Sequence, residues 1–335
     1  MRGPRVAVIG AGLSGLGATH HLLRVGCEVT LFEQEGVGKG TSAVATGLVH
    51  PCRGMPFADA GMRETKVLLQ EAASALGRSP VISGGIVRLA MEGKREQTLL
   101  RTILQRADCR PVEGGGCFPG FSGARIGSGL TIDVPLYLQG LFLSSLGSGL
   151  RFTNRRVCPL SLSPDFDQVV MATGGDVLRS ERTRPLLRNT LSENKGQVLL
   201  CASPSPFRLP ESVIGKGYVA VTSDPDRFIF GATYEKTFPD RSPCIRKAKE
   251  VIFSKVGRFF PGCTLFSVLD CLAGIRVHRR RVRLPLIGRL RKNVWIITAM
   301  GSFGLLYHAF TGKTLAIAIK EGREEEIPEA LRLCR

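Results

Sequence analysis

The sequence lacks the features that mark membrane, secreted and zinc-binding proteins. No window holds the ~18 uninterrupted apolar residues of a membrane-spanning helix, and the nearest candidate, residues 303–319, contains His308 and Lys313 and is predicted to be a buried helix. The N-terminus runs directly into a strand-like segment and has no secretory signal. The ten cysteines form no Cys-x-x-Cys pair and none lies at zinc-ligand spacing near a histidine pair. We therefore expect a cytoplasmic protein with reduced cysteines, no transmembrane segment and no metal site.

Acidic residues are also scarce, because 28 Asp and Glu stand against 46 Lys and Arg and leave a formal net charge of +18. Apolar residues reach 43% of the 335, which excludes a wholly disordered chain and suits one large or two ordinary domains. The 40 glycines are not spaced by threes, so collagen is excluded. A basic, glycine-rich globular chain points towards a phosphate-bearing ligand, although the charge alone also suits nucleic acid, anionic lipid or an acidic substrate.

The first 33 residues predict a β-α-β unit that binds a dinucleotide. A buried strand over residues 6–9 is followed by Gly10-x-Gly12-x-x-Gly15, a helix over residues 13–25, and a second strand ending at Glu33. The glycines would allow the tight turn, the approach of a pyrophosphate and close packing of helix on strand. Glu33 would accept hydrogen bonds from ribose hydroxyls, which favours an unphosphorylated ribose over NADP.

Two further glycine-rich elements distinguish FAD from NAD. Residues 169–175, Val-Val-Met-Ala-Thr-Gly-Gly, close the nucleotide end, and residues 301–305, Gly-Ser-Phe-Gly-Leu, join a buried strand to a helix near the C-terminus. A second helix N-terminus directed at the ligand suits the electron-rich pyrimidine edge of a flavin. The sequence therefore predicts an α/β fold in which a Rossmann-type FAD-binding domain carries an inserted, mainly antiparallel α+β substrate domain.

The remaining elements are predicted from apolar periodicity and turn residues. We expect helices over residues 63–76, 96–107, 134–146 (with Asp133 as N-cap), 246–259 and 305–320. We expect strands over residues 81–91, 150–157, 168–172, 197–201, 218–221, 227–231 and 294–298, and a loop or hairpin over the glycine-rich residues 113–129. The nucleotide-type pieces lie at both ends of the chain, so the predicted FAD-binding domain comprises residues 1–80, 130–190 and 270–335, and the substrate domain residues 81–129 and 191–269.

In this order along the chain the motifs resemble the D-amino acid oxidase family of FAD-dependent oxidoreductases, nearest its glycine oxidase and sarcosine oxidase branch. They are also similar to the oxidase domain of the tRNA 5-methylaminomethyl-2-thiouridine biosynthesis enzyme. The matching pieces are Gly10 to Glu33, Gly40 to Pro51, Asp167 to Gly175, Lys195-Gly-Gln197, Gly231-Ala-Thr-Tyr-Glu235, Ala273-Gly-Ile-Arg276, Leu284-Pro-Leu-Ile-Gly288 and Gly301 to Leu305.

The resemblance implies a non-covalent FAD, because the stretch that matches the flavin-bearing cysteine of sarcosine oxidase-like relatives has no cysteine. It places adenosine and pyrophosphate at the first glycine turn and Glu33, phosphate at Thr41 and Ser42, adenine at Val157, and the isoalloxazine between residues 47–49 and 301–305. The residues expected to bind FAD are Gly10, Gly12, Leu13, Ser14, Gly15, Glu33, Thr41, Ser42, Gly47, Leu48, Val157, Thr173, Gly174, Gly301, Ser302, Phe303, Gly304 and Leu305.

On the substrate side, the resemblance assigns Arg276 to the substrate carboxylate, Tyr218 to the same carboxylate and Tyr234 to the pocket wall. A guanidinium can form two parallel hydrogen bonds with a carboxylate, which lysine cannot. Alternatively, Arg276 is solvated or binds phosphate within the basic run of residues 276–283, and the tyrosines are ordinary strand aromatics. The proline that usually follows this arginine is replaced by Val277.

We expect oxidation of the C–N bond of an amino acid or N-substituted glycine, by hydride transfer to the flavin and hydrolysis of the imine. No general base is needed, and His50 and His308 either tune the flavin or are ordinary core histidines. Oxygen is the default electron acceptor and a quinone the alternative. Two other hypotheses are a tRNA-modifying oxidase that acts on a carboxymethylaminomethyl uridine, with the basic run docking RNA, and a non-catalytic flavin-binding protein.

Overall fold

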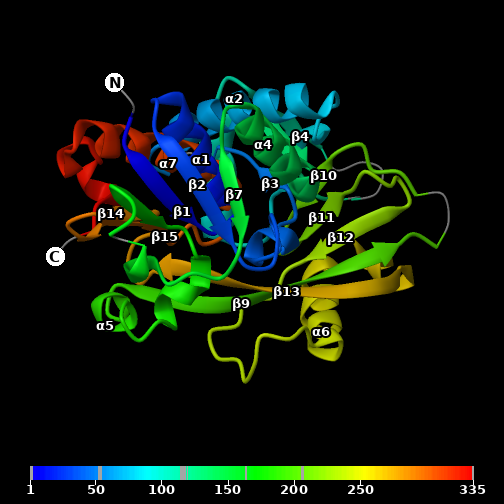
Figure 1. Ribbon diagram of the computed structural model, residues 1–335. Helices are drawn as coiled ribbons and strands as arrows, with labels where there is room; N and C mark the ends of the chain where they lie inside the picture. Colours follow the sequence, from blue (N-terminus) through cyan, green and yellow to red (C-terminus); the bar gives the residue numbers. More distant parts are fainter. Residues whose placement is uncertain are drawn as a thin grey trace.

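A computed structural model describes residues 3–51, 55–113, 118, 120–162, 164–204 and 207–333. The strands form two sheets, and Figure 1 shows the long strands β9 (Leu191–Ala202) and β13 (Ser267–Arg279) crossing beneath the first sheet. Part of the glycine-rich region expected over residues 113–129, namely residues 114–117 and 119, lies outside the described residues.

The first sheet has six strands in the order β14-β15-β8-β1-β2-β7. Five of them are parallel, and β14 pairs antiparallel with β15. Their bounds are β1 Arg5–Ile9, β2 Glu28–Glu33, β7 Arg151–Asn154, β8 Gln168–Met171, β14 Leu286–Arg291 and β15 Val294–Thr298. Because the central strands are parallel, the carboxyl ends of β1, β2, β8 and β15 meet at one edge of the sheet, where ligands bind in folds of this kind.

Four helices form the main apolar core with this sheet: α1 Leu13–Arg24, α2 Ala58–Leu76, α4 Val134–Gly147 and α7 Gly304–Glu321. Helices α1 and α7 cross at Gly17 and Gly312, where a Cβ added to Gly312 would lie 2.5 Å from the backbone of Gly17. The expected N-cap of α4 is confirmed, since the Asp133 carboxylate accepts a hydrogen bond of 3.1 Å from the Leu136 amide. Helix α7 is a buried helix as predicted, and among the described helices none could cross a membrane.

The second sheet is mainly antiparallel, in the order β13-β9-β12-β11-β10-β4-β6-β3, with β5 on β6. Its other strands are β3 Leu48–Val49, β4 Val81–Leu89, β5 Cys109–Val112, β6 Gly123–Ile132, β10 Ser212–Ile214, β11 Tyr218–Val221 and β12 Arg227–Gly231. Helix α6, Ile245–Val256, packs on β9, β12 and β13 with a phenylalanine-rich core, and α3, Lys94–Leu104, packs on β5 and β6. Short helical segments cover residues 41–44, 159–161, 174–178, 184–187, 261–265, 324–326 and 329–331.

Two sequence expectations need correction. Residues 123–129, expected in a loop or hairpin, belong to the ten-residue strand β6, where they pair with β4 and β5. Apolar periodicity predicted no strand where β13 lies. Strand β9 is longer than the expected residues 197–201, because its residues from Leu191 to Ala202 pair with β13 over twelve positions. These pairings join residues about 80 positions apart, so they are specified by tertiary contacts and not by a local pattern. The division of the chain into domains stays a prediction.

Candidate FAD and substrate site

The first glycine turn lies between β1, β8 and α1. Gly10 has φ +103°, and a Cβ there would come 2.6 Å from the Ala172 carbonyl oxygen. A Cβ on Gly15 would come 1.7 Å from the Gly10 carbonyl oxygen, so this position in the first turn of α1 admits no side chain without moving the backbone. The first-turn amides of α1 have no partner within their own helix and carry the positive end of its dipole.

The Glu33 carboxylate, at the carboxyl end of β2, is held by backbone amides. One oxygen accepts from the Ala11 amide at 2.8 Å and the other from the amides of Gln34 and Glu35, at 2.7 and 3.1 Å. These bonds fix the carboxylate beside the glycine turn, where its remaining lone pairs can accept from hydroxyls.

A cavity of about 1080 Å³ extends from the start of α1 to the second sheet. Of the expected site residues it is lined by Leu13, Ser14, Thr41, Ser42, Gly47, Leu48, Gly174, Tyr218, Tyr234, Arg276, Gly301, Ser302, Phe303, Gly304 and Leu305. The expected residues outside its lining are Gly10, Gly12, Gly15, Glu33, Val157 and Thr173, which belong to the turns and strand ends beside it. Sequence motifs from both ends of the chain therefore meet at one cavity.

The segment between the two sheets, residues 41–49, forms one wall of this cavity. The Ser42 hydroxyl accepts from the Leu13 amide at 3.1 Å, and the Thr41 hydroxyl donates to the Ile275 carbonyl oxygen at 2.8 Å. Gly274 makes this approach possible, because a Cβ there would lie 2.4 Å from the Val44 side chain. Thr41 and Ser42 therefore tie strand β13 to the start of α1, and both hydroxyls already have protein partners.

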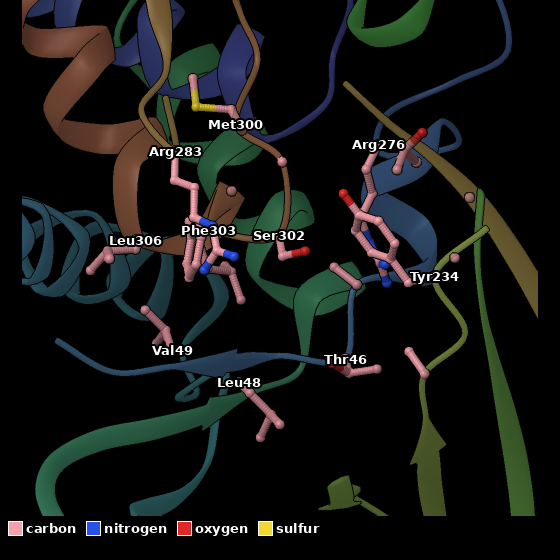
Figure 2. A pocket seen from close by; sticks show the side chains of 18 of the residues that line it. Thr46, Leu48, Val49, Tyr234, Arg276, Arg283, Met300, Ser302, Phe303 and Leu306 are labelled. Carbon is pink, nitrogen blue, oxygen red and sulfur yellow. The ribbon is translucent and has the colours of Figure 1, made fainter. Parts of the chain in front are cut away.

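The opposite wall is the loop from β15 to α7. Ala299 is left-handed with φ +61°, an unfavourable conformation for a residue with a Cβ, and the Gly301 amide donates to the Val277 carbonyl oxygen at 2.8 Å. Helix α7 then begins at Gly304, so a second helix N-terminus opens at the cavity, as Figure 2 shows around Ser302 and Phe303.

Arg276 and Tyr234 both line the cavity, and Figure 2 shows them on the side of the view away from Phe303. The half-buried Arg276 guanidinium occupies the space over Gly196 on β9, where a Cβ would come 2.3 Å from Arg276 Nη1. Within the described part of the chain no carboxylate or other hydrogen-bonding group pairs with this guanidinium. An unpaired cation on a cavity wall is suited to an anionic ligand.

Tyr218 lies next to Arg276 and its ring covers Gly231, its cross-strand partner, where a Cβ would come 2.1 Å from the ring. Burial raises the pKa of the Tyr218 hydroxyl, against the smaller effects of a Thr46 hydrogen bond and of Arg276. The hydroxyl thus stays protonated and can donate a hydrogen bond. The sequence analysis did not predict that Gly196 and Gly231 shape the site. Each is a glycine on the strand next to a functional side chain, Gly196 beside Arg276 and Gly231 beside Tyr218, and this pattern is the signal that could have identified them.

A buried polar network holds the Tyr234 loop on β9. Gln197 donates to the Glu235 carboxylate at 2.7 Å, and Thr233 donates to the same oxygen at 2.9 Å. Lys247 completes the network with an ion pair of 2.7 Å to Glu235. The Lys-Gly-Gln and Gly-Ala-Thr-Tyr-Glu motifs therefore fix the backbone that carries Tyr234, which is itself 51% exposed.

His308, in the first turns of α7, is a core histidine. Its Nε2 lies 2.7 Å from the Tyr137 hydroxyl and its Nδ1 3.0 Å from the Leu305 carbonyl oxygen, which defines a neutral ring that donates from Nδ1 and accepts at Nε2. Burial lowers its pKa to about 4. His308 does not line the cavity, whereas His50 does, and burial lowers the pKa of His50 to about 4 as well.

We expect stability to fall steeply in weak acid because of these histidines. A histidine in the unfolded chain has a pKa near 6.5 and is protonated below that pH. In the folded protein His308 stays neutral until the pH approaches 4, so between these values the unfolded chain binds a proton that the folded protein does not. Between pH 6.5 and pH 4, each such histidine lowers the free energy of unfolding by ~1.4 kcal/mol for every unit by which the pH falls. Above pH ~7 it has no effect on the free energy of unfolding. In urea unfolding at a series of pH values, His308→Gln, which keeps an acceptor for Tyr137, should show a shallower loss of stability than the wild type. Equal slopes would contradict the assignment.

The site fits FAD. The first residues of two helices, Leu13 and Ser14 of α1 and Gly304 and Leu305 of α7, line the cavity, so it offers amide donors both to a pyrophosphate and to the electron-rich edge of a flavin. Gly10 and Gly15 keep the turn between β1 and α1 close-packed against Ala172, and the Glu33 carboxylate is held beside that turn by the Ala11 amide. The residues that would hold FAD are the members of the expected FAD-binding set that line the cavity, together with Glu33 and the first glycine turn.

Comparison with known proteins establishes the class. The family model for FAD-dependent oxidoreductases, abbreviated DAO, matches residues 5–317, so the chain belongs to this family. It is 26% identical over 328 residues to the tRNA 5-methylaminomethyl-2-thiouridine biosynthesis bifunctional protein of Maricaulis maris, covering 95% of this chain but 52% of that protein, so it spans about half the length of that relative.

It is 27% identical over 293 residues to a D-amino-acid oxidase of Rubrobacter xylanophilus, covering 84% of this chain and 85% of that protein. A similar solved structure is the iminodiacetate oxidase of Chelativorans sp. BNC1, with TM-score 0.79, 21% identity and 98% of each chain covered. The FAD-binding fold with a second, substrate-binding sheet, and dependence on FAD, are thereby confirmed.

Proposed function

We propose that this protein oxidises the C–N bond of an amino acid or N-substituted glycine, with FAD bound non-covalently in the cavity. The observation that carries the proposal is the Arg276 guanidinium on the cavity wall, which pairs with no carboxylate among the described residues and lies next to Tyr218. Together they provide a planar fork and a neutral donor for a carboxylate. The names of the relatives, a D-amino-acid oxidase and an iminodiacetate oxidase, support a substrate with this group.

The chain's own residues would bind and orient the substrate. Arg276 would form two hydrogen bonds with the carboxylate and so orient the α-carbon within the cavity, between the walls that carry Leu48 and Ser302. The positive charge of Arg276 would disfavour an ammonium group, so the amine would bind in its neutral form. FAD, when bound, would supply an acceptor for the hydride that the substrate α-carbon loses, and the resulting imine would be hydrolysed by water. No general base is assigned.

Non-covalent attachment is supported by the lining, because none of the cavity residues in the described part of the chain is a cysteine. We propose oxygen as the electron acceptor, with a quinone as the alternative. Stoichiometric hydrogen peroxide during turnover in air supports oxygen, and its absence together with reduction of a soluble quinone supports the second.

The deciding experiment is anaerobic bleaching of the purified yellow protein by glycine, sarcosine, iminodiacetate, D-alanine and proline. We expect at least one carboxylate-bearing amine to bleach the flavin, and the matching amine without the carboxylate, such as dimethylamine for sarcosine, to fail. If no amine bleaches the flavin, the protein is a flavin-binding protein without this activity.

A second candidate keeps the chemistry but places the carboxymethylaminomethyl group on tRNA. It is supported by the exposed arginines of residues 280–283, of which Arg283 reaches the cavity, and by the similarity to the tRNA-modifying protein. Bleaching by undermodified tRNA that weakens as salt is raised, with no bleaching by free amines, would favour this candidate.

A further inference from the structure

The cavity has an unusual charge balance. The side chains that line it include four cations, Arg88, Lys216, Arg276 and Arg283, and no aspartate or glutamate among the described residues. Arg88 is neutralised by Glu96 at 3.1 Å. Three cations therefore remain without a carboxylate partner within the described structure.

Lys216 is held rigidly at the cavity wall by the turn from β10 to β11. The Gly215 amide donates to the Gly217 carbonyl oxygen at 2.8 Å. Both glycines are packed closely, since a Cβ on Gly215 would lie 2.5 Å from the Phe259 ring and one on Gly217 would lie 2.5 Å from the Gly231 carbonyl oxygen. The turn therefore cannot retract into the protein, and the lysine it carries is exposed at the cavity.

A further cation, Lys255, stands behind this turn. Its ammonium donates to the Ala232 carbonyl oxygen at 2.8 Å, next to the loop that carries Tyr234. Burial lowers the pKa of Lys255, and the positive charges of Lys216 and Arg276, which both line the cavity, lower it further. No described carboxylate offsets that effect.

A single substrate carboxylate does not balance this cluster. It would pair with Arg276 and leave Lys216 on the cavity wall, with Lys255 behind it, without a counter-charge among the described residues, while the substrate amine is neutral. Like charges gathered in a partly buried site cost free energy unless a ligand supplies the opposite charge. The cluster is thus complementary to a ligand with two negative charges, one at Arg276 and one at the turn of residues 215–217.

We propose that the substrate carries a second anionic group, and that Lys216, with Lys255 behind it, forms the subsite for that group. The inference rests on the proposed oxidation of a carboxylate-bearing amine and narrows it to dicarboxylic amino acids or N-carboxyalkyl amino acids. Arg283 also lines the cavity, and Figure 2 shows it on the opposite side of the view from Arg276, so it is the competing position for a second anion.

The test uses two thioethers that bind but have no C–N bond to oxidise, thiodiacetate with two carboxylates and methylthioacetate with one. Each is titrated into the FAD-loaded protein and its Kd is read from the change in flavin absorbance. We expect wild-type protein to bind thiodiacetate roughly 10-fold more tightly. Lys216→Gln should remove that preference and leave the Kd of methylthioacetate within about 2-fold.

Lys249→Gln is the matched control, because this exposed lysine on α6 does not line the cavity and its loss changes the net charge equally. It should keep the preference. The proposal is overturned if wild-type protein binds the two thioethers equally, if Lys216→Gln weakens both by the same factor, as expected for a lysine that serves only the flavin, or if Arg283→Gln removes the preference instead.

The same ligands separate this proposal from the proposed function. If sarcosine bleaches the flavin while the thioethers bind equally, only the second subsite is wrong. If thiodiacetate is preferred through Lys216 while no amine bleaches the flavin, the subsite exists and the proposed oxidation is wrong. In turnover, the wild-type protein should have a higher kcat/KM for iminodiacetate than for sarcosine. Lys216→Gln should reduce the ratio of these two values.

Discussion

Replacing Arg276 with alanine is expected to lower kcat/KM for a carboxylate-bearing amine by roughly 10²–10³-fold, because a hydrogen-bonded charge pair in a partly buried site is worth ~3–4 kcal/mol. The guanidinium fills the space over Gly196 and has no described protein partner, so its removal breaks no internal ion pair. Stability should therefore change little. Stopped-flow reduction of the flavin over a range of substrate concentrations measures the effect, mostly as a rise in apparent Kd.

Two variants make this result specific. Arg276→Lys keeps the charge but loses the planar fork, and we expect it to recover only part of the affinity. Arg258→Ala removes an exposed arginine that does not line the cavity and should behave as wild type. An unchanged apparent affinity in Arg276→Ala would show that the carboxylate binds elsewhere.

Replacing Gly15 with alanine is expected to abolish FAD binding and to destabilise the fold by ~3 kcal/mol or more. The added Cβ would lie 1.7 Å from the Gly10 carbonyl oxygen and 3.4 Å from the Ala172 side chain. The first contact is with backbone, so no rotamer change relieves it, and α1 must move away from β1. Flavin absorbance per mole of purified protein and urea unfolding measure the two effects.

The control for this substitution is Gly147→Ala, at the end of α4. A Cβ there meets no atom within 4 Å, so the variant should keep both the flavin and the stability of the wild type. Full flavin content in Gly15→Ala would mean that the turn between β1 and α1 does not hold the cofactor.

Local signals predicted the β-α-β unit at the start of the chain well. The Gly10 turn, the helix that follows it and Glu33 belong to one continuous β-α-β unit, and such a unit has a recognisable pattern because its contacts are short-range. The resemblance carried by the ordered motifs pointed to the right family. The sequence did not predict that the Thr41 hydroxyl donates to the Ile275 carbonyl oxygen or that the Ser42 hydroxyl accepts from the Leu13 amide; the phosphate contacts expected of these residues stay a prediction.

The substrate end depends on tertiary structure. Strand β13, which carries Arg276, gave no periodic signal because the strand is recognisable only through its pairing with β9, where Arg276 is opposite Asn194. That pairing places the guanidinium over Gly196, a neighbour 80 positions away in the sequence, and the β10–β11 turn adds Lys216 to the same cavity.

By itself the sequence determined the family, the cofactor and the two helix starts that flank the cavity, because each is encoded by glycines at fixed local spacing. It also showed an excess of 18 positive charges without showing where any of them acts. Only the tertiary structure separated Arg88, neutralised by Glu96, from Lys216 and Arg276, for which no described carboxylate is a partner. The reason is physical: whether a charge is compensated depends on the distance to its neighbours in space, and long-range strand pairing sets that distance.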